Sequence, residues 1–153
     1  MTAIAVKGTP IEVLVVDDSP GDVRLTQDAL REVNRAIHVQ VACDGVEAMA
    51  ILNREGEHAG AARPDLILLD LNMPRMDGRE VLVRIKADDH LRQIPTIILT
   101  TSESEADIAK SYELRANSYL SKPVQLDEFE SLMRSINEFW LTKAKLPPRV
   151  VNR

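Results

Sequence analysis

Three aspartates stand at the ends of two apolar segments of the chain. Asp17 and Asp18 directly follow residues 11–16, and Asp70 directly follows residues 66–69. If these segments are neighbouring strands, the three carboxylates converge, and they repel by about 4 kcal/mol per pair at about 4 Å and an effective dielectric constant of about 20. A divalent cation removes this repulsion, and hard Mg²⁺ takes carboxylate, water and phosphate oxygens as ligands. The pattern predicts a magnesium site, although aspartates at strand ends also serve as helix caps.

A hydroxyl and an ammonium group are expected on the same rim as the aspartates. Thr100 ends the apolar segment 96–99, and Lys122 closely follows the segment 118–120. Alone, such a threonine is usually only a strand end and such a lysine only a solvated charge. Together with the aspartates they supply what a bound phosphoryl group requires, namely a carboxylate nucleophile, a metal, a hydroxyl donor and a cation. The set therefore predicts phosphoryl transfer to a carboxylate.

Five short apolar segments alternate with five helical patterns along the chain. Such alternation predicts a parallel sheet with helices on both faces, and right-handed crossovers leave few possible topologies. A ligand of such a sheet binds beyond the carboxyl ends of the strands, where the candidate residues lie. The first helix is expected to begin with Ser19 as the N-cap and Pro20 at the first helical position. The expected strands cover residues 11–16, 39–41, 66–69, 96–99 and 118–120, and the later helices cover residues 46–53, 78–86, 105–114 and 126–143.

Four motifs carry a family resemblance. They are Val-Val-Asp-Asp-Ser at 15–19, Leu-Leu-Asp-Leu-Asn-Met-Pro-Arg-Met-Asp-Gly at 68–78, Leu-Thr-Thr at 99–101 and Ser-Lys-Pro at 121–123. In this order and spacing they resemble the receiver domain of two-component response regulators, over roughly residues 12–140. The resemblance implies a flavodoxin-like, doubly wound (βα)5 fold of the α/β class, with five parallel strands in the order 2-1-3-4-5. It also implies a phosphoprotein that receives its phosphoryl group from a sensor histidine kinase and is not a conventional turnover enzyme.

The resemblance assigns a phosphoacceptor and a metal site to residues of this chain. Asp70 corresponds to the phosphoacceptor of the family. Asp17 and Asp18 correspond to the acid pair that binds Mg²⁺ or Mn²⁺, and Asp70 and the backbone carbonyl of Asn72 complete the expected protein ligands.

The resemblance also assigns the residues that respond to the phosphoryl group. Thr100 corresponds to the hydroxyl that hydrogen-bonds a phosphoryl oxygen, and Lys122 to the ammonium that pairs with the phosphate. The bond between Lys122 and Pro123 is expected to be cis, as in the family. Tyr119 occupies the position of the switch aromatic residue, which is expected to rotate inward when Thr100 moves toward the phosphoryl group.

A narrower resemblance concerns the start of the first helix and the C-terminal segment. The Ser-Pro-Gly-Asp sequence at 19–22 and residues 136–148 are similar to those of cyanobacterial response regulators that partner phytochrome histidine kinases. This similarity implies a phytochrome-type kinase as the partner.

The last expected helix has a wide apolar face. Residues at helical spacing form a stripe that should face the sheet, with Leu132 and Phe139 at its edge and Trp140 close to the end of the sheet. Large aromatic residues at such a margin often mark a contact surface, so Leu132, Phe139 and Trp140 are candidate interface residues of a C₂ homodimer formed through the fourth helix, fifth strand and fifth helix. Alternatively, Phe139 and Trp140 pack against the chain's own first helix, with residues 146–148 laid over them. The stripe consists of Leu126, Phe129, Met133, Ile136 and Trp140.

The composition narrows the classes of partner. A net charge of −5 without a basic block argues against nucleic-acid binding, and no apolar run is long enough to cross a membrane. The single cysteine, Cys43, is expected to be half-buried after the second strand, and an unpaired thiol is typical of a reducing cytoplasm. We expect an arm over residues 1–10, one receiver domain over 11–145 and a tail over 146–153, without a second domain.

Two other functions use similar residues. A magnesium-dependent phosphatase with an aspartyl nucleophile is the main alternative, but its nucleophile normally lies on the first strand with a second aspartate two positions later, where this chain has Ser19. No segment is available for the cap domain of such an enzyme. A flavin-binding module needs a phosphate-binding loop rich in Ser, Thr or Gly after the first strand, whereas Asp17 and Asp18 place negative charge there.

Overall fold

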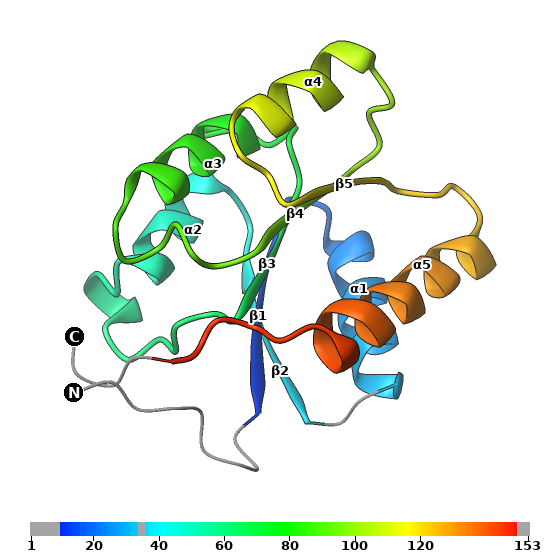
Figure 1. The fold of residues 1–153 in the computed structure, drawn as a ribbon, viewed down its shortest axis with the longest axis horizontal. Helices are drawn as coiled ribbons and strands as arrows, with labels where there is room; N and C mark the ends of the chain where they lie inside the picture. Colours follow the sequence, from blue (N-terminus) through cyan, green and yellow to red (C-terminus); the bar gives the residue numbers. More distant parts are fainter. Residues whose placement is uncertain (1–9, 34–35, 150–153) are drawn as a thin grey trace.

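The computed structural model describes residues 10–33 and 36–149, and its centre is a five-stranded parallel sheet (Figure 1). The strands are β1 (Ile11–Val16), β2 (Ile37–Ala42), β3 (Leu66–Leu69), β4 (Thr96–Thr100) and β5 (Ser118–Ser121). Their order is β2-β1-β3-β4-β5, so the predicted flavodoxin-like order is confirmed. The register of β1 and β3 pairs Val16 with Leu69, which brings the ends of these two strands side by side.

Helices cover both faces of the sheet (Figure 1). Those in the described ranges are α1 (Pro20–Val33), α2 (Gly45–Leu52), α3 (Gly78–Ala87), α4 (Glu105–Glu113) and α5 (Leu126–Glu138), with a 3₁₀ turn η1 (Gly56–His58) and a π-helical turn η2 (Phe139–Lys143). None of these helices is long and apolar enough to cross a membrane. In β1, Val13 packs into the core under α1 and α5, whereas Leu14 packs into the core under α2 and α3. Successive side chains of a strand point to opposite faces, so an apolar run without alternation is what a strand between two helical layers requires.

The start of α1 and the end of β2 show how far local sequence signals reach. The backbone N–H of Asp22 donates to Ser19 Oγ at 3.3 Å, as the predicted N-cap requires.

β2 is longer than predicted and ends at Ala42, and the expectation of a half-buried Cys43 is wrong. Cys43 is exposed because it follows the last strand residue and lies on the turn that leads into α2.

The helix predicted over residues 126–143 changes its geometry near its end. It is α-helical to Glu138 and π-helical over Phe139–Lys143, where the backbone N–H of Ala144 donates to the carbonyl of Phe139 at 2.7 Å. A π turn holds more residues than an α turn, so the buried face shifts and Leu141 becomes a core residue.

The predicted inward stripe of this helix is correct in its middle, where Phe129, Met133 and Ile136 are buried. Trp140 is half-buried against the core under α1 and α5. The stripe is wrong at Leu126, which is 53% exposed because it is the first residue of α5, at the rim of the sheet.

The chain after η2 crosses the amino-terminal edge of the sheet. Arg149 Nε donates to Asp65 Oδ1 at 3.0 Å, and Arg149 Nη2 donates to Asp65 Oδ2 and to the Pro10 carbonyl. Asp65 is buried, and it also accepts the backbone N–H of Glu12 at 2.9 Å. These bonds join the C-terminal segment to the start of β1 and to the residue preceding β3. Most of the arm predicted over residues 1–10, and residues 150–153 of the predicted tail, lie outside the described residues.

Candidate functional site

The carboxyl ends of β1 and β3 bring Asp17, Asp18 and Asp70 together. One carboxylate oxygen from each residue lies within 4.8 Å of the other two. Asp17 and Asp70 are almost completely buried, whereas Asp18 is exposed. All three donors are hard, negatively charged oxygens, which is the donor set that Mg²⁺ and Mn²⁺ prefer. These residues are therefore suited to bind a divalent cation at the carboxyl-terminal edge of the sheet.

The loop after β3 is held in a tight turn around Asp70. The backbone N–H of Gly78 donates to the Leu71 carbonyl at 2.8 Å, and a Cβ atom on Gly78 would lie only 2.1 Å from the Asp70 carbonyl oxygen. Gly78 is therefore required for the loop to close at this point. Asn72 lies on this loop, and its backbone N–H points at Asp70 Oδ1 at 3.4 Å.

Lys122 reaches into the acidic cluster from the end of β5. Its Nζ atom lies 2.7 Å from Asp17 Oδ2, 3.0 Å from Asp22 Oδ2 and 3.3 Å from Asp70 Oδ2. Burial alone would lower the pKa of Lys122, but these carboxylates raise it above its ordinary value, so the ammonium stays charged. Burial raises the pKa of Asp17, and the hydrogen bonds from Lys122 and Ser19 offset this only in part.

The bond between Lys122 and Pro123 differs from the expectation. No peptide bond in residues 10–33 and 36–149 is cis, so the predicted cis bond is wrong for this structure. The trans form of an X–Pro bond is favoured by about 0.5–1 kcal/mol in the absence of other constraints. Such a small preference is decided by the surrounding fold, which a three-residue motif does not report.

Thr100 and Tyr119 both contact Ser102. Thr100 is fully buried at the end of β4, and its Oγ1 lies 3.5 Å from the backbone N–H of Ser102. Tyr119, in β5, is half-buried against the core under α2 and α3, and its hydroxyl donates to the Ser102 carbonyl at 2.9 Å. The structure thus connects the two predicted switch residues through one residue of the loop between β4 and α4.

A family model described as "Response regulator receiver domain" matches residues 13–134. The chain belongs to this family. The response regulator Rcp1 of Synechocystis is 44% identical over 138 residues, which cover 90% of this chain and 94% of Rcp1. The match favours a signalling receiver domain over the phosphatase alternative.

Two solved receiver structures are similar to this one. The phosphorylated cyanobacterial phytochrome response regulator RcpA is 47% identical, with a TM-score of 0.87 over 90% of this chain and 99% of RcpA. The Mn²⁺-bound form of Rcp1 is 43% identical, with the same TM-score over 90% of this chain and 99% of that chain. The Rcp1 structure contains a bound Mn²⁺. A divalent metal is also what the cluster of carboxylate oxygens in this receiver domain is suited to bind.

The sequence analysis did not predict an ion-pair network that lies beside the site formed by Asp17, Asp18, Asp70 and Lys122. Arg79 Nη2 donates to Asp107 Oδ1 at 2.6 Å, and Ser102 Oγ donates to Asp107 Oδ2 at 2.6 Å. The hydrogen bond from Ser102 lowers the pKa of Asp107, and the guanidinium of Arg79 lowers it further. The network connects the first turn of α3 with α4 and with the loop that carries Ser102. Arg79 and Asp107 are 28 positions apart in the sequence, and neither has a local signal that names its partner.

Sequence reasoning also missed the role of Asp22 in this site. The only available signal was an acidic residue in the first turn of a helix, inside the motif at 19–22. An acid there is usually explained by the helix dipole. In the structure its carboxylate instead reaches Lys122.

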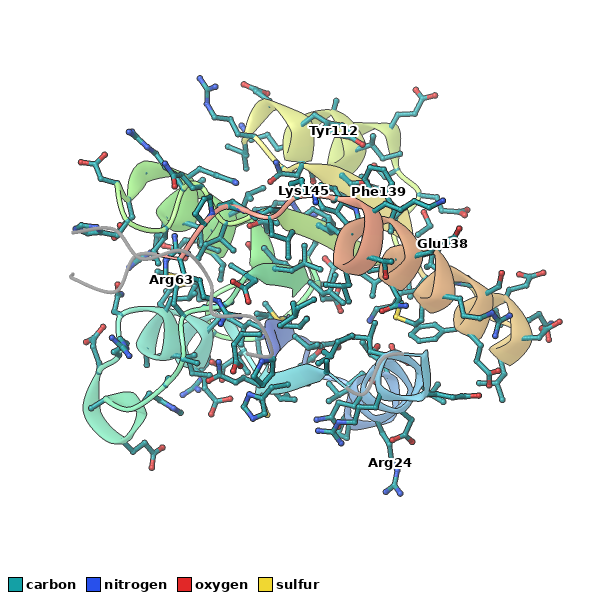
Figure 2. All side chains as sticks on the ribbon, turned by 60° about the horizontal axis from the view of Figure 1, so that its bottom comes forward. Arg24, Arg63, Tyr112, Glu138, Phe139 and Lys145 are labelled. Atoms are coloured by element: carbon teal, nitrogen blue, oxygen red, sulfur yellow. The ribbon has the colours of Figure 1, made fainter. Side chains whose placement is uncertain are left out.

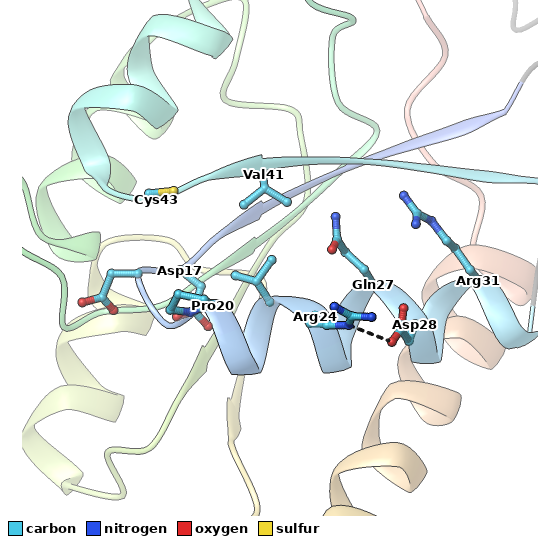
Figure 3. Close-up of a pocket in the computed structure, with 10 residues that line it drawn as sticks. Asp17, Pro20, Arg24, Gln27, Asp28, Arg31, Val41 and Cys43 are labelled. Carbon is cyan, nitrogen blue, oxygen red and sulfur yellow. Dashed lines mark ion pairs between the residues drawn. The ribbon is translucent and has the colours of Figure 1, made fainter.

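A cavity of about 420 Å³ lies beside the receiver site, between α1 and the end of β2 (Figure 3). Its lining includes Asp17 and Asp18 from the acidic cluster, together with Val23 and Val41. Arg24 is paired with Asp28 at 3.9 Å, and Figure 2 shows its side chain projecting from α1 away from the rest of the molecule. The cavity therefore adjoins two of the three acids of the cluster, Asp17 and Asp18.

Proposed function

We propose that this receiver domain is a phosphorylation switch whose phosphoacceptor is Asp70. The observation that supports this most directly is the buried ammonium of Lys122, which lies 3.3 Å from Asp70 Oδ2 at the centre of the acidic cluster. In the proposed transfer, an oxygen of Asp70 forms a bond to the phosphorus of a phosphohistidine. The P–N bond breaks, and its electron pair returns to the imidazole nitrogen, which takes a proton from water. The charged Lys122 faces the transferring group and compensates its negative charge.

The proposed metal ligands are Asp17, Asp18, Asp70 and the backbone carbonyl of Asn72. Mg²⁺ is the proposed ion, and the Mn²⁺-bound Rcp1 structure supports Mn²⁺ as a substitute. When bound, the cation supplies positive charge that neutralises the phosphoryl oxygens during transfer.

Phosphorylation is proposed to act on the rest of the molecule through Thr100. The phosphoryl group adds a charge of about −2 and three acceptor oxygens. The hydroxyl of Thr100 then turns toward these oxygens and loosens its contact with Ser102, which also accepts the hydroxyl of Tyr119. Tyr119 moves in response, and the surface of α4, β5 and α5 changes.

The proposed phosphodonor is a sensor histidine kinase of the phytochrome type. The resemblance to the phytochrome response regulator RcpA supports this partner. A donor protein must approach the rim from which Lys122 emerges, and two apolar residues are exposed there: Val124 at 97% and Leu126 at 53%. Exposed apolar side chains of this kind suit a protein partner better than nucleic acid, and the net charge of −5 agrees.

Phosphorylation is expected to require a divalent cation. Incubating the protein with an acyl phosphate donor and Mg²⁺ should attach one phosphoryl group, and a chelator should slow the reaction by more than about tenfold. The Asp18→Asn variant should need more Mg²⁺ for half-maximal rate, because it loses an exposed charged ligand. Asp28→Asn, an exposed aspartate on α1, is the matched control and should behave as wild type. Equal rates with and without the chelator would contradict the proposed metal site.

We also propose a C₂ homodimer through the α4, β5 and α5 surface. Phe139 is 56% exposed at the end of α5 (Figure 2), and its ring meets that of Trp140 edge-on with centroids 5.4 Å apart. Trp140 and Leu132 are half-buried against the core under α1 and α5, so each of the three candidate residues leaves part of its side chain exposed. Trp140 packs partly against the core, as the intramolecular alternative expected for this residue. Most of the Phe139 side chain is exposed and is available for contact with a partner.

The Phe139→Glu variant is expected to sediment as a monomer at micromolar concentrations at which wild type sediments as a dimer. A charge buried at the centre of an apolar interface costs several kcal/mol. Val83→Glu is the matched control, since Val83 is an apolar residue of α3 that is 46% exposed on the other face of the sheet. A wild type that is monomeric both with and without phosphorylation would rule out the dimer.

A further inference from the structure

We propose that Asp22 is a positioning residue of the phosphoacceptor site: it holds the ammonium of Lys122 on the α1 side and limits its pairing with the phosphoryl group on Asp70. The inference rests on the proposed function of Asp70. Asp22 is not one of the three acids that form the metal cluster.

The hydrogen-bond capacity of Lys122 is limited. An ammonium group has three N–H donors and no acceptor. Three carboxylates take these donors, with Nζ at 2.7 Å from Asp17, 3.0 Å from Asp22 and 3.3 Å from Asp70. Asp70 is thus the most distant of the three partners. A phosphoryl oxygen on Asp70 can gain a close hydrogen bond from Lys122 only in competition with Asp17 and Asp22.

The two competing carboxylates differ in what else they do. Asp17 is a proposed metal ligand, and its other oxygen accepts the backbone N–H of Ser19 at 2.9 Å. Within residues 10–33 and 36–149, the Asp22 carboxylate is paired only with Lys122, and its side chain is 35% exposed. A bound cation would share the negative charge of Asp17 with Lys122, whereas the charge of Asp22 would remain available to Lys122. Asp22 therefore remains the partner that holds Lys122 when the site is loaded.

The position of Asp22 on α1 fixes this contact. The residue lies in the first turn, where its own backbone N–H is bound to Ser19 Oγ at 3.3 Å. The cap sets the direction of the helix as it leaves β1, so the carboxylate is presented to Lys122, 100 positions later in the chain. A role limited to the helix dipole would not need this side-chain contact.

Two steps of the phosphoryl cycle should respond to Asp22. In the gain step an oxygen of Asp70 bonds to phosphorus as the donor leaves. In the loss step a water oxygen bonds to phosphorus, the bond to the Asp70 oxygen breaks, and its electron pair restores the carboxylate, while the water proton passes to solvent. Lys122 stabilises the phosphoryl group, so an ammonium released from Asp22 should favour gain and oppose loss.

The test compares Asp22→Asn with wild type in the full chain, with an acyl phosphate donor and Mg²⁺. We expect phosphorylation to become about three- to tenfold faster and the aspartyl phosphate to last about three- to tenfold longer, as loss of one charge-assisted bond allows. Asp22→Glu should restore wild-type kinetics in part, because it keeps the charge. Asp28→Asn removes the same charge from an exposed position on α1 and should change neither rate.

A double-mutant cycle separates positioning from simple removal of charge. In the Lys122→Ala background, Asp22→Asn should change neither rate, because its effect passes through the ammonium. The same change in both backgrounds, or unchanged kinetics in Asp22→Asn with only a lower unfolding free energy, would overturn the inference and leave Asp70 as the phosphoacceptor. A wild type that takes up no phosphoryl group would overturn the proposed function, and the inference with it.

Discussion

The Asp70→Asn variant is expected to take up no phosphoryl group from an acyl phosphate donor in the presence of Mg²⁺. The amide of asparagine has nearly the shape of the carboxylate but lacks the anionic oxygen that attacks phosphorus. The turn around position 70 depends on the backbone contacts of Gly78, which this substitution leaves in place. The mass of the intact protein after incubation measures the loss directly.

The matched control for this variant is Asp89→Asn. Asp89 follows α3 on the opposite rim of the sheet and is paired at the surface with Arg92 at 3.1 Å. It should be phosphorylated at the wild-type rate. If Asp70→Asn gains phosphate as fast as Asp89→Asn, the assignment of Asp70 is wrong.

The Arg149→Ala variant is expected to lower the free energy of unfolding by about 2–3 kcal/mol. The Asp65 side chain is buried, with 6% exposed, and the Arg149 side chain is half-buried, with 22% exposed. Removing the guanidinium leaves an uncompensated carboxylate in the protein interior, which is the costly half of a buried ion pair. Within the part of the chain that the structure describes, the Asp65 side chain would keep the hydrogen bond from the backbone N–H of Glu12. Urea unfolding followed by circular dichroism measures the change.

Two further variants identify the cause of this loss. Arg84→Ala removes an arginine from an exposed pair with Glu80, and it should cost less than about 0.5 kcal/mol. Adding Asp65→Asn to Arg149→Ala should recover part of the stability, because the buried group is then neutral. A loss from Arg149→Ala no larger than that from Arg84→Ala would show that the C-terminal segment is not held by this pair.

The fold was predictable because its signals are local and repeated. β3 is apolar throughout and β1 is apolar except at Glu12, and an acidic residue directly follows each strand. The alternation with helices then places Asp17 and Asp70 at one edge whatever the details of the loops. The convergence of Asp17 and Asp70, two of the proposed metal ligands, follows from the strand order.

The polar contacts around the site were not predictable, because they join distant positions through side chains. Asp22 meets Lys122 across 100 positions, and Arg79 meets Asp107 across 28. A charged residue on a helix has many possible partners, and its sequence neighbours do not select one. Only the tertiary fold, which brings the first turn of α1 to Lys122 and the first turn of α3 to α4, selects these partners.

The end of α5 shows a different limit. Helical spacing predicts a buried stripe only while each turn holds the same number of residues. The π turn over Phe139–Lys143 breaks this condition, so Leu141 is buried and Phe139 is exposed. At the other end, Leu126 fits the periodicity but lies beyond the surface that the sheet can cover.

Locating the phosphorylated residue in the wild-type protein is the most direct test of Asp70 as the phosphoacceptor. The protein is treated with an acyl phosphate donor and Mg²⁺, and borohydride then reduces the aspartyl phosphate to homoserine, whose position peptide mass spectrometry identifies. We expect homoserine at position 70 and at no other aspartate. Homoserine at position 17, 18 or 22, or phosphate gained without any homoserine, would contradict the assignment of Asp70 as the phosphoacceptor.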